Sequence, residues 1–305
     1  MNYRRRGDLL PIVVAVLWSV GCSPAGRGMD VVEKSDASGD HLSYGDMTQS
    51  TIIDPLPDSG VVSGPVQIVI TADNAYSFGY GDANGITHFT QGKSTVSWGE
   101  IYNCPVAVIA QNPDATNKGP EAYTIAEADA PPSAYLYIVS WDDLAVTQGV
   151  IAQFKRPGAQ IYTGDAKFEA CATGINYSSG AVGAASLVGP MQADINTQIA
   201  LCNAGTGDQT TTSGGWVNTT GAVTPGAVGV VAVGEDNSSD SGSFPIACQT
   251  GQTGPGSLGI DAAAKWMWYD PSGVGGDAAF HSDGTNKYRS YLIFRLKAAD
   301  IPPIL

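Results

Sequence analysis

Six carboxylate and amide side chains next to apolar runs could together bind calcium. They are Asp73, Asn74, Asp82, Asn84, Asp142 and Asp143. Calcium takes six to eight oxygen ligands from carboxylates, amides and backbone carbonyls. If the segments that carry them lie on neighbouring strands, these oxygens could converge on a structural Ca²⁺. The same residue types cap turns, which is the alternative interpretation.

Aromatic side chains are the second set that could do chemistry, because a sugar ring packs on a flat aromatic ring while polar groups bind its hydroxyls. The candidates are Tyr76, Tyr80, Trp98, Tyr102, Trp141, Trp216, Trp266, Trp268 and Tyr269. Most of these rings would fill the core of a β protein. Trp98 and Trp216 lie among Ser and Gly residues typical of exposed loops. We predict Trp98, Tyr102 and Trp216 as the ligand contacts.

Motifs of common enzyme classes are absent from the sequence. It has no G-x-S-x-G nucleophile turn, no H-E-x-x-H zinc motif and no G-x-x-x-x-G-K-[ST] phosphate loop. The scattered histidines His41, His88 and His281 also disfavour a zinc site. A glycosidase needs only two suitably spaced carboxylates, and the 29 acidic residues offer many pairs. A glycan-processing enzyme therefore stays an alternative to a non-catalytic binding protein.

The charge balance disfavours nucleic acid as a partner. Lys and Arg number 15 against 29 acidic residues, a formal net charge of −14. Such a surface repels phosphate backbones. It suits an exported protein that binds calcium or neutral sugars, although solubility alone would also explain it.

Five cysteines favour an oxidising compartment. With Cys22 set aside for the signal described below, Cys104, Cys171, Cys202 and Cys248 form an even set. An even set in an exported protein favours two disulfides. Three pairings are open, and we favour Cys171–Cys202 with Cys104–Cys248.

The N-terminus carries an export signal. Three arginines, Arg4 to Arg6, precede an apolar run from Leu9 to Val20, which ends before Gly21 and Cys22. The run is shorter than the roughly 20 residues of a membrane-spanning helix. The arrangement resembles a bacterial lipoprotein signal over residues 1–21, in which Cys22 carries the lipid. The alternative is an ordinary secretory signal cleaved nearby.

The resemblance also implies a location. Ser23 follows the cysteine, as in lipoproteins sorted to the bacterial outer membrane. The protein would be lipid-anchored there, facing the periplasm or the cell surface. Residues 22–63 are rich in Ser, Asp, Gly and Pro, which predicts a disordered tether. A folded domain is expected over residues 64–298.

That domain is predicted to be all-β, because low charge and abundant Gly, Thr, Ser and aromatics favour strands and turns. The expected strands cover residues 66–72, 76–80, 98–102, 106–111, 134–141, 146–154, 228–233, 264–269 and 288–296. Strand 134–141 is apolar on both faces, and we expect 146–154 to return as its hairpin partner. Asp82 to Gly85 is expected to form a tight turn.

One short helix is expected over residues 191–202 in the Gly- and Thr-rich segment 157–258. Met191, Ile195, Ile199 and Cys202 share one helical face. Pro190 before the helix and Gly205 after it match the usual start and stop residues.

Five segments together resemble galactose-binding-like jelly-roll domains of exported bacterial proteins. They are Thr71–Tyr76, Ala134–Trp141 with Asp142-Asp143, Gln148–Phe154, Lys265–Asp270 and Tyr291–Arg295. The resemblance implies a β-sandwich with Greek-key connections that binds carbohydrate, often with a structural calcium. Segment 157–258 has no counterpart in the simple fold and would be an insertion or an elaborated edge.

The sequence thus predicts a cell-envelope lipoprotein that presents a β-sandwich for an extracellular ligand, most simply a glycan. The first alternative is a structural or adhesive surface protein that binds other proteins and has no small-molecule site. The second is a glycan-processing enzyme.

The lipid anchor is testable by Cys22→Ser. Because this change removes the thiol that would carry the lipid, we expect the protein to leave the membrane fraction, as followed by fractionation and immunoblotting. Ser35→Ala, in the tether, is the matched control and should stay anchored. A Cys22→Ser protein that remains anchored would contradict the lipoprotein prediction.

Overall fold

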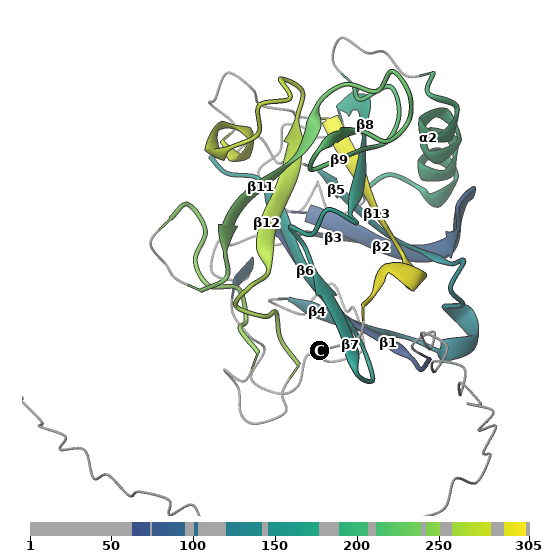
Figure 1. Cartoon of the computed structure of the whole chain (residues 1–305), viewed down its shortest axis with the longest axis vertical. Helices are drawn as coiled ribbons and strands as arrows, with labels where there is room; N and C mark the ends of the chain where they lie inside the picture. The colour runs from purple at the N-terminus through teal and green to yellow at the C-terminus, as the bar shows by residue number, and fades with distance from the viewer. Residues whose placement is uncertain are drawn as a thin grey trace, which may run out of the picture. The chain divides into compact units, whose positions relative to one another are not determined.

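Two antiparallel β-sheets face each other across an apolar core in the computed structural model (Figure 1). The structure describes residues 63–73, 75–94, 101–102, 120–141, 146–176, 189–206, 212–238, 242–250, 258–281 and 290–302. All of them belong to one unit, Pro55–Leu305. The all-β sandwich predicted from composition is confirmed, whereas jelly-roll topology stays a prediction.

Sheet A has the strand order β11-β12-β6-β1-β4, with β7 paired to β6. Its strands are β1 (Val66–Asp73), β4 (Glu121–Ile125), β6 (Gly149–Arg156), β7 (Ala159–Tyr162), β11 (Val230–Asp236) and β12 (Lys265–Asp270). Sheet B has the order β10-β9-β8-β13-β5-β2-β3. Its strands are β2 (Ala75–Asp82), β3 (Gly85–Ser94), β5 (Tyr135–Trp141), β8 (Glu169–Asn176), β9 (Val217–Asn218), β10 (Gly221–Ala222) and β13 (Ser290–Lys297). Among the described residues, short 3₁₀ helices at Glu127–Asp129, Asp277–Phe280 and Ala298–Asp300 flank strands.

The chain crosses between the sheets where the sequence suggested simple turns. Strand β1 belongs to sheet A and β2, which follows it, belongs to sheet B. The predicted hairpin of 134–141 with 146–154 is wrong, because β5 lies in sheet B and β6 in sheet A. Strand β5 is paired on both sides, by β2 and β13, and so offers no open edge to β6.

Segment 157–258 is part of both sheets. It supplies β7 and the edge strand β11 to sheet A, and it extends sheet B beyond β13 with β8, β9 and β10. The segment therefore elaborates the edges of the sandwich and is not a separate insertion.

The predicted helix is confirmed as α2 (Gln192–Ala204), which ends at Gly205 in the left-handed conformation with φ 65°. Ile195, Ile199 and Cys202 are buried as expected. Met191 is 54% exposed instead, because it is the N-cap residue and lies outside the helical turns.

Two apolar clusters stabilise the fold. The larger lies between the sheets and includes inward-facing residues of β1, β2, β4 and β6. The smaller lies between the outer face of sheet B and α2, and it joins Ile195 and Ile199 to Tyr137, Val139 and Trp141. Burial of this outer face explains why β5 is apolar on both faces.

One further predicted strand needs correction, and other predictions lie outside the described residues. Ile101 and Tyr102 are helical, so a strand over 98–102 is wrong for these two residues. The expected strand at 106–111 lies outside the described residues, as do the lipid-attachment residue Cys22 and the tether up to residue 62.

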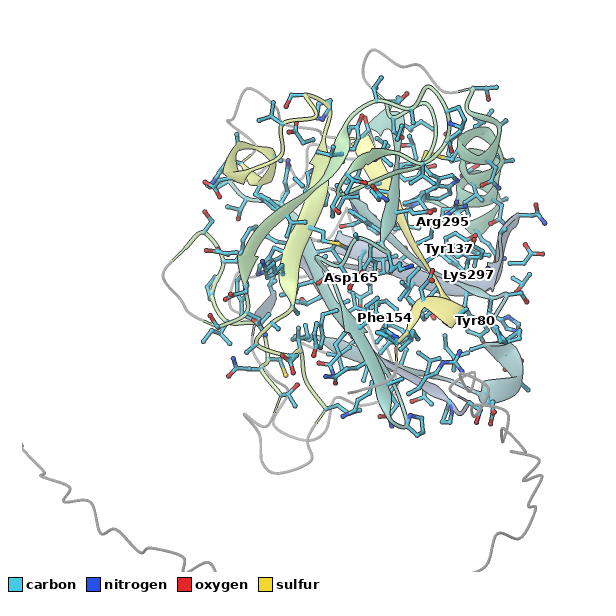
Figure 2. The ribbon with its side chains drawn as sticks, viewed as in Figure 1. Tyr80, Tyr137, Phe154, Asp165, Arg295 and Lys297 are labelled. Atoms are coloured by element: carbon cyan, nitrogen blue, oxygen red, sulfur yellow. A yellow bond between two sulfur atoms is a disulfide. The ribbon has the colours of Figure 1, made fainter. Side chains whose placement is uncertain are left out.

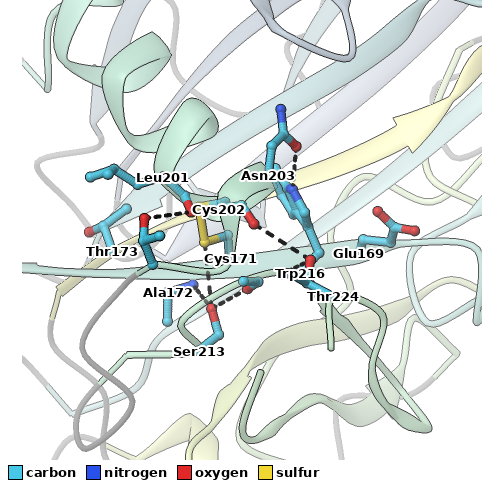
Figure 3. Close-up of a disulfide and its surroundings, with 12 residues drawn as sticks. Glu169, Cys171, Ala172, Thr173, Leu201, Cys202, Asn203, Ser213, Trp216 and Thr224 are labelled. Carbon is cyan, nitrogen blue, oxygen red and sulfur yellow. Dashed lines mark hydrogen bonds between the residues drawn. A yellow bond between two sulfur atoms is a disulfide. The ribbon is translucent and has the colours of Figure 1, made fainter. Parts of the chain in front are cut away.

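A disulfide joins α2 to sheet B. The predicted pair Cys171–Cys202 is present (Figure 3), and both cysteines are almost fully buried. Ser213 Oγ lies 3.5 Å from Cys171 Sγ. Cys248 is also disulfide-bonded, and the predicted partner Cys104 lies outside the described residues.

Arg295 of β13 is the polar centre of the same interface. Its guanidinium carbon lies 3.7 Å from the centre of the Trp216 ring, and Nε donates to Glu169 Oε2 at 2.6 Å. It lies beside Tyr137 (Figure 2). Nη1 also donates to Asn203 Oδ1 of α2 at 3.0 Å. Stacking of a desolvated guanidinium on an aromatic ring contributes about 2 kcal/mol, so this cluster stabilises helix docking.

The disulfide should contribute to stability through the loop that it closes. The double variant Cys171→Ser, Cys202→Ser opens a loop with a sequence separation of 31. Urea unfolding should show a loss of about 3 kcal/mol, because the unfolded chain gains conformational freedom. An unchanged free energy of unfolding would show that the cross-link does not constrain the unfolded chain.

Candidate functional site

A pocket of about 360 Å³ lies where the edge strand of sheet A faces the edge strand of sheet B. Nine described residues line it, namely Phe78, Tyr80, His88, Phe89, Thr90, Ala122, Tyr123, Thr124 and Ile125. Five of the nine have aromatic or imidazole rings. The volume falls in the range of small-molecule sites.

The crossing of the chain between sheets creates this pocket. Strand β4 pairs with β1, and β3 pairs with β2. Since β1 and β2 are consecutive but belong to different sheets, their outer neighbours β4 and β3 border the same side of the sandwich.

One wall of the pocket is a stacked pair of rings. Tyr80 of β2 and His88 of β3 lie with ring centres 4.5 Å apart and planes 10° apart. A register shift between Tyr80 and Gly81 puts His88 opposite Tyr80. Thr87 Oγ1 lies 3.1 Å from His88 Nδ1. Since Tyr80 and His88 both line the pocket, this wall consists of flat rings.

The floor is formed by inward-facing residues of the two sheets. The rings of Phe78 and Tyr123 lie 4.7 Å apart. The Tyr123 hydroxyl lies 2.9 Å from that of Tyr76, and Tyr76 donates to the carboxylate of Glu121. Both tyrosines and Glu121 are buried.

None of the described lining residues carries a carboxylate, ammonium or guanidinium group. Partial burial, together with the negative charge of Asp129, raises the pKa of Tyr80. Its hydroxyl therefore stays protonated at neutral pH. These properties suit an uncharged ligand with hydroxyl groups.

Helix α2 holds the start of β3, two residues from the pocket. Asn196 Oδ1 accepts from the Ile86 amide at 2.8 Å, and Asn196 Nδ2 donates to the Ile86 carbonyl at 3.0 Å. Gln192 Nε2 also donates to the Ile86 carbonyl, at 2.7 Å. A Cβ at Gly85 would lie 2.9 Å from Asn196 Cγ, so glycine permits this close approach.

The structure corrects the predicted ligand contacts. Trp216 is 1% exposed and Tyr102 is 5% exposed, so neither offers a ring to a ligand. Trp216 is covered because it stacks on Arg295. It also donates from Nε1 to Asn203 Oδ1 at 2.8 Å (Figure 3). Tyr102 packs against Trp266. Trp98 lies outside the described residues.

The described members of the predicted calcium set do not converge. Asp73 Oδ2 accepts from Thr147 Oγ1 at 2.6 Å, whereas Asp82 Oδ1 accepts from the Asn84 amide at 2.7 Å. The latter contact is the turn capping considered as the alternative. Within the described part of the chain, no three His, Cys, Asp or Glu residues group as a metal site. Asn74, Asp142 and Asp143 lie outside it, and calcium stays a prediction.

A Ser, a His and an Asp do meet elsewhere, but not as a catalytic triad. His281 Nε2 lies 3.2 Å from Ser243 Oγ and 3.1 Å from Asp277 Oδ2. In a triad the serine and the acid contact opposite ring nitrogens. Here both contact the same nitrogen, so the acid cannot orient the histidine as a base for the serine.

The sequence identified Tyr80 as an aromatic candidate but missed His88 and Tyr123 as its neighbours in the pocket. The turn at Asp82–Gly85 signals a hairpin, and an uninterrupted ladder from it would pair Tyr80 with Thr87. Only the observed register shift selects His88. Tyr123 belongs to sheet A, and no pattern in the sequence indicates that it lines the same pocket as Tyr80.

Searches against family models, curated proteins and solved structures found no match for this chain. Among the helices of the described residues, none is long and apolar enough to cross a membrane.

The contact of α2 with β3 can be tested by Asn196→Ala. The variant loses two hydrogen bonds, so unfolding by urea should show a loss of about 1–2 kcal/mol. Hydrogen exchange of the Ile86 amide should accelerate, because Asn196 Oδ1 is its acceptor. Thr197→Ala, whose hydroxyl donates to the Ala193 carbonyl within α2, is the control and should leave this exchange unchanged. Unchanged Ile86 exchange in Asn196→Ala would contradict the assigned contact.

Proposed function

We propose that this chain is a cell-envelope lipoprotein whose β-sandwich binds a neutral saccharide in the pocket between β3 and β4. The observation that carries the proposal is a pocket between the edge strands β3 and β4 whose described lining is rich in aromatic rings and has no carboxylate, ammonium or guanidinium group. A saccharide needs a flat apolar ring and polar groups around it. Tyr80 and His88 would supply the former, and the hydroxyls of Thr90 and Tyr80 the latter.

Charge supports a neutral ligand over an anionic one. The whole chain has a formal net charge of −14, and the described pocket residues include no Lys or Arg to offset it. An anionic ligand would therefore meet a repulsive field without a countercharge.

The anchor, the outer-membrane location and the kinship with galactose-binding-like domains belong to the same proposal. Cys22 would hold the protein on the membrane, and the following tether would let the sandwich reach saccharides of the cell envelope. Disulfide-bonded Cys171, Cys202 and Cys248 support an oxidising compartment outside the cytoplasm.

The proposal predicts that Tyr80→Ala loses saccharide binding. A glycan array followed by calorimetry with the purified full-length protein would first identify the ligand. Tyr80→Ala should then raise Kd at least about tenfold, because the stacking surface is removed.

Tyr162→Ala is the matched control, since Tyr162 is also half-buried beside the same core but does not line the pocket. It should bind as the unchanged protein does. Equal binding by Tyr80→Ala, or no saccharide bound by the unchanged protein, would refute the proposal.

A further inference from the structure

A second, smaller pocket lies on the outer face of sheet A. The described residues that line it are Gln67, Val69, Gln153, Lys155, Thr250, Leu258 and Gly259. Its volume is about 170 Å³, and it shares no described lining residue with the pocket between β3 and β4. Since a cavity of about 150 Å³ can hold benzene, this pocket suits a molecule of about six heavy atoms.

The register of β1 and β6 places four of these side chains on one face. Two cross-strand pairs contribute to the pocket, Gln67–Lys155 and Val69–Gln153. Between them on β1, Ile68 lies opposite Tyr123, whose ring packs on Phe78 of sheet B. Ile68 therefore faces the core between the sheets. Because successive side chains of a strand point to opposite faces, the two pairs stand on the outer face of sheet A.

Hydrogen bonds hold the other lining residues over this face. The Thr250 amide donates to the Ile260 carbonyl at 3.0 Å, and the Ile260 amide donates to the Cys248 carbonyl at 2.9 Å. Buried Asn237 also donates from Nδ2 to the Ile260 carbonyl, at 3.1 Å. A Cβ at Gly259 would lie 2.7 Å from the Cys248 carbonyl oxygen, so glycine permits this close packing. The wall of the pocket is therefore in place without a ligand.

Gln153 joins this wall to β6, and that contact decides which atom of its amide is left for a ligand. The side chain is 6% exposed, and Oε1 accepts from the Asp261 amide at 2.8 Å. Only the oxygen of a glutamine amide can accept, so this orientation is fixed. Among the described residues Nε2 has no hydrogen-bond partner, yet it is not one of the fully buried polar atoms that lack one. The Nε2 donor is therefore open to the pocket that Gln153 lines.

The remaining polar groups of the described lining can also donate, and one carries a positive charge. Lys155 is half-buried, and its ammonium group forms no ion pair with any described carboxylate. Gln67 adds an amide and Thr250 a hydroxyl. The Asp261 carboxylate, next to the Gln153 contact, accepts from the Ala263 amide at 2.9 Å and does not line the pocket.

We infer that this pocket is a second binding site, for a short-chain monocarboxylate. Lys155 and the Nε2 group of Gln153 donate to the carboxylate, and Val69 and Leu258 contact the alkyl chain. Hydrogen bonds that involve a charge on both partners are the strongest available here. A single ammonium group balances a single negative charge, so in a chain of net charge −14 a monoanion is favoured over a phosphate dianion. The site is independent of the proposed saccharide binding.

The first test is an NMR titration of the purified, ¹⁵N-labelled full-length protein with butyrate at constant ionic strength. The side-chain amide signal of Gln153 should shift saturably, with a Kd on the order of 1–10 mM for so small a ligand. Butyramide has the same shape without the charge and should bind at least about tenfold more weakly. No saturable shift with butyrate, equal affinity for butyramide, or tighter binding of inorganic phosphate would overturn the inference.

Lys155→Met tests the charge, since it removes the ammonium group and keeps the length of the side chain. Its affinity for butyrate should fall at least about tenfold. Lys297→Met is the matched control, because it removes the same charge from an exposed lysine of β13 in sheet B. It should bind butyrate as the unchanged protein does. Equal affinity in Lys155→Met and Lys297→Met would contradict the assigned site.

Gln153→Glu tests the donor. It keeps an oxygen for the Asp261 amide but replaces Nε2 with a second carboxylate oxygen, which repels the ligand. Binding, followed at the backbone amide of Thr250, should again weaken at least about tenfold; an unchanged Kd would count against the inference. Tyr80→Ala should bind butyrate normally, because Tyr80 lines only the other pocket. Failure of the saccharide proposal would therefore leave this result intact.

Discussion

The passage of the chain from sheet A to sheet B between Asp73 and Ala75 is the constraint on which the pocket depends. Asp73 accepts from Thr147 on one side of the crossing, and Ser140 Oγ donates to the Ala75 carbonyl on the other. A partly buried hydrogen bond thus holds one end of the crossing, and a buried one holds the other. Because the crossing makes β1 and β2 neighbours in space, the strands that flank them face each other and leave an aromatic-lined opening.

The second layer of organisation lies on the outer face of sheet B. Helix α2 covers that face, and its C-terminal end is held by the disulfide to β8 and by Asn203, which accepts from Trp216 and Arg295. Its N-terminal half holds Ile86 at the start of β3. The helix therefore links a buried cluster in the sheet to the strand that carries His88. Trp216, a candidate for ligand binding from its loop-like sequence, stabilises this linkage instead.

Local patterns in the sequence located most elements well. Strands β1, β5, β12 and β13 follow runs of β-branched and aromatic residues, and α2 follows a helical repeat between Pro190 and Gly205. The pairing of strands was predicted less well than their positions. The expected hairpin of 134–141 with 146–154 is wrong because β2 and β13 pair with the two edges of β5. Pairing between strands that are distant in sequence is not visible in any local sequence pattern.

The sequence by itself determined the all-β class, the helix and Tyr80 as an aromatic candidate. It favoured Cys171–Cys202 but left three cysteine pairings open, and the structure shows that pair. Tertiary structure decided which aromatic rings are buried and which line a pocket. Trp216 is buried because it packs on Arg295 and donates a hydrogen bond to Asn203. Tyr80 lies opposite His88 because of a one-residue register shift. Tyr80 and Tyr123 line the same pocket because the two sheets pack face to face. Exposure depends on what packs over a side chain, and that is set by residues far away along the chain.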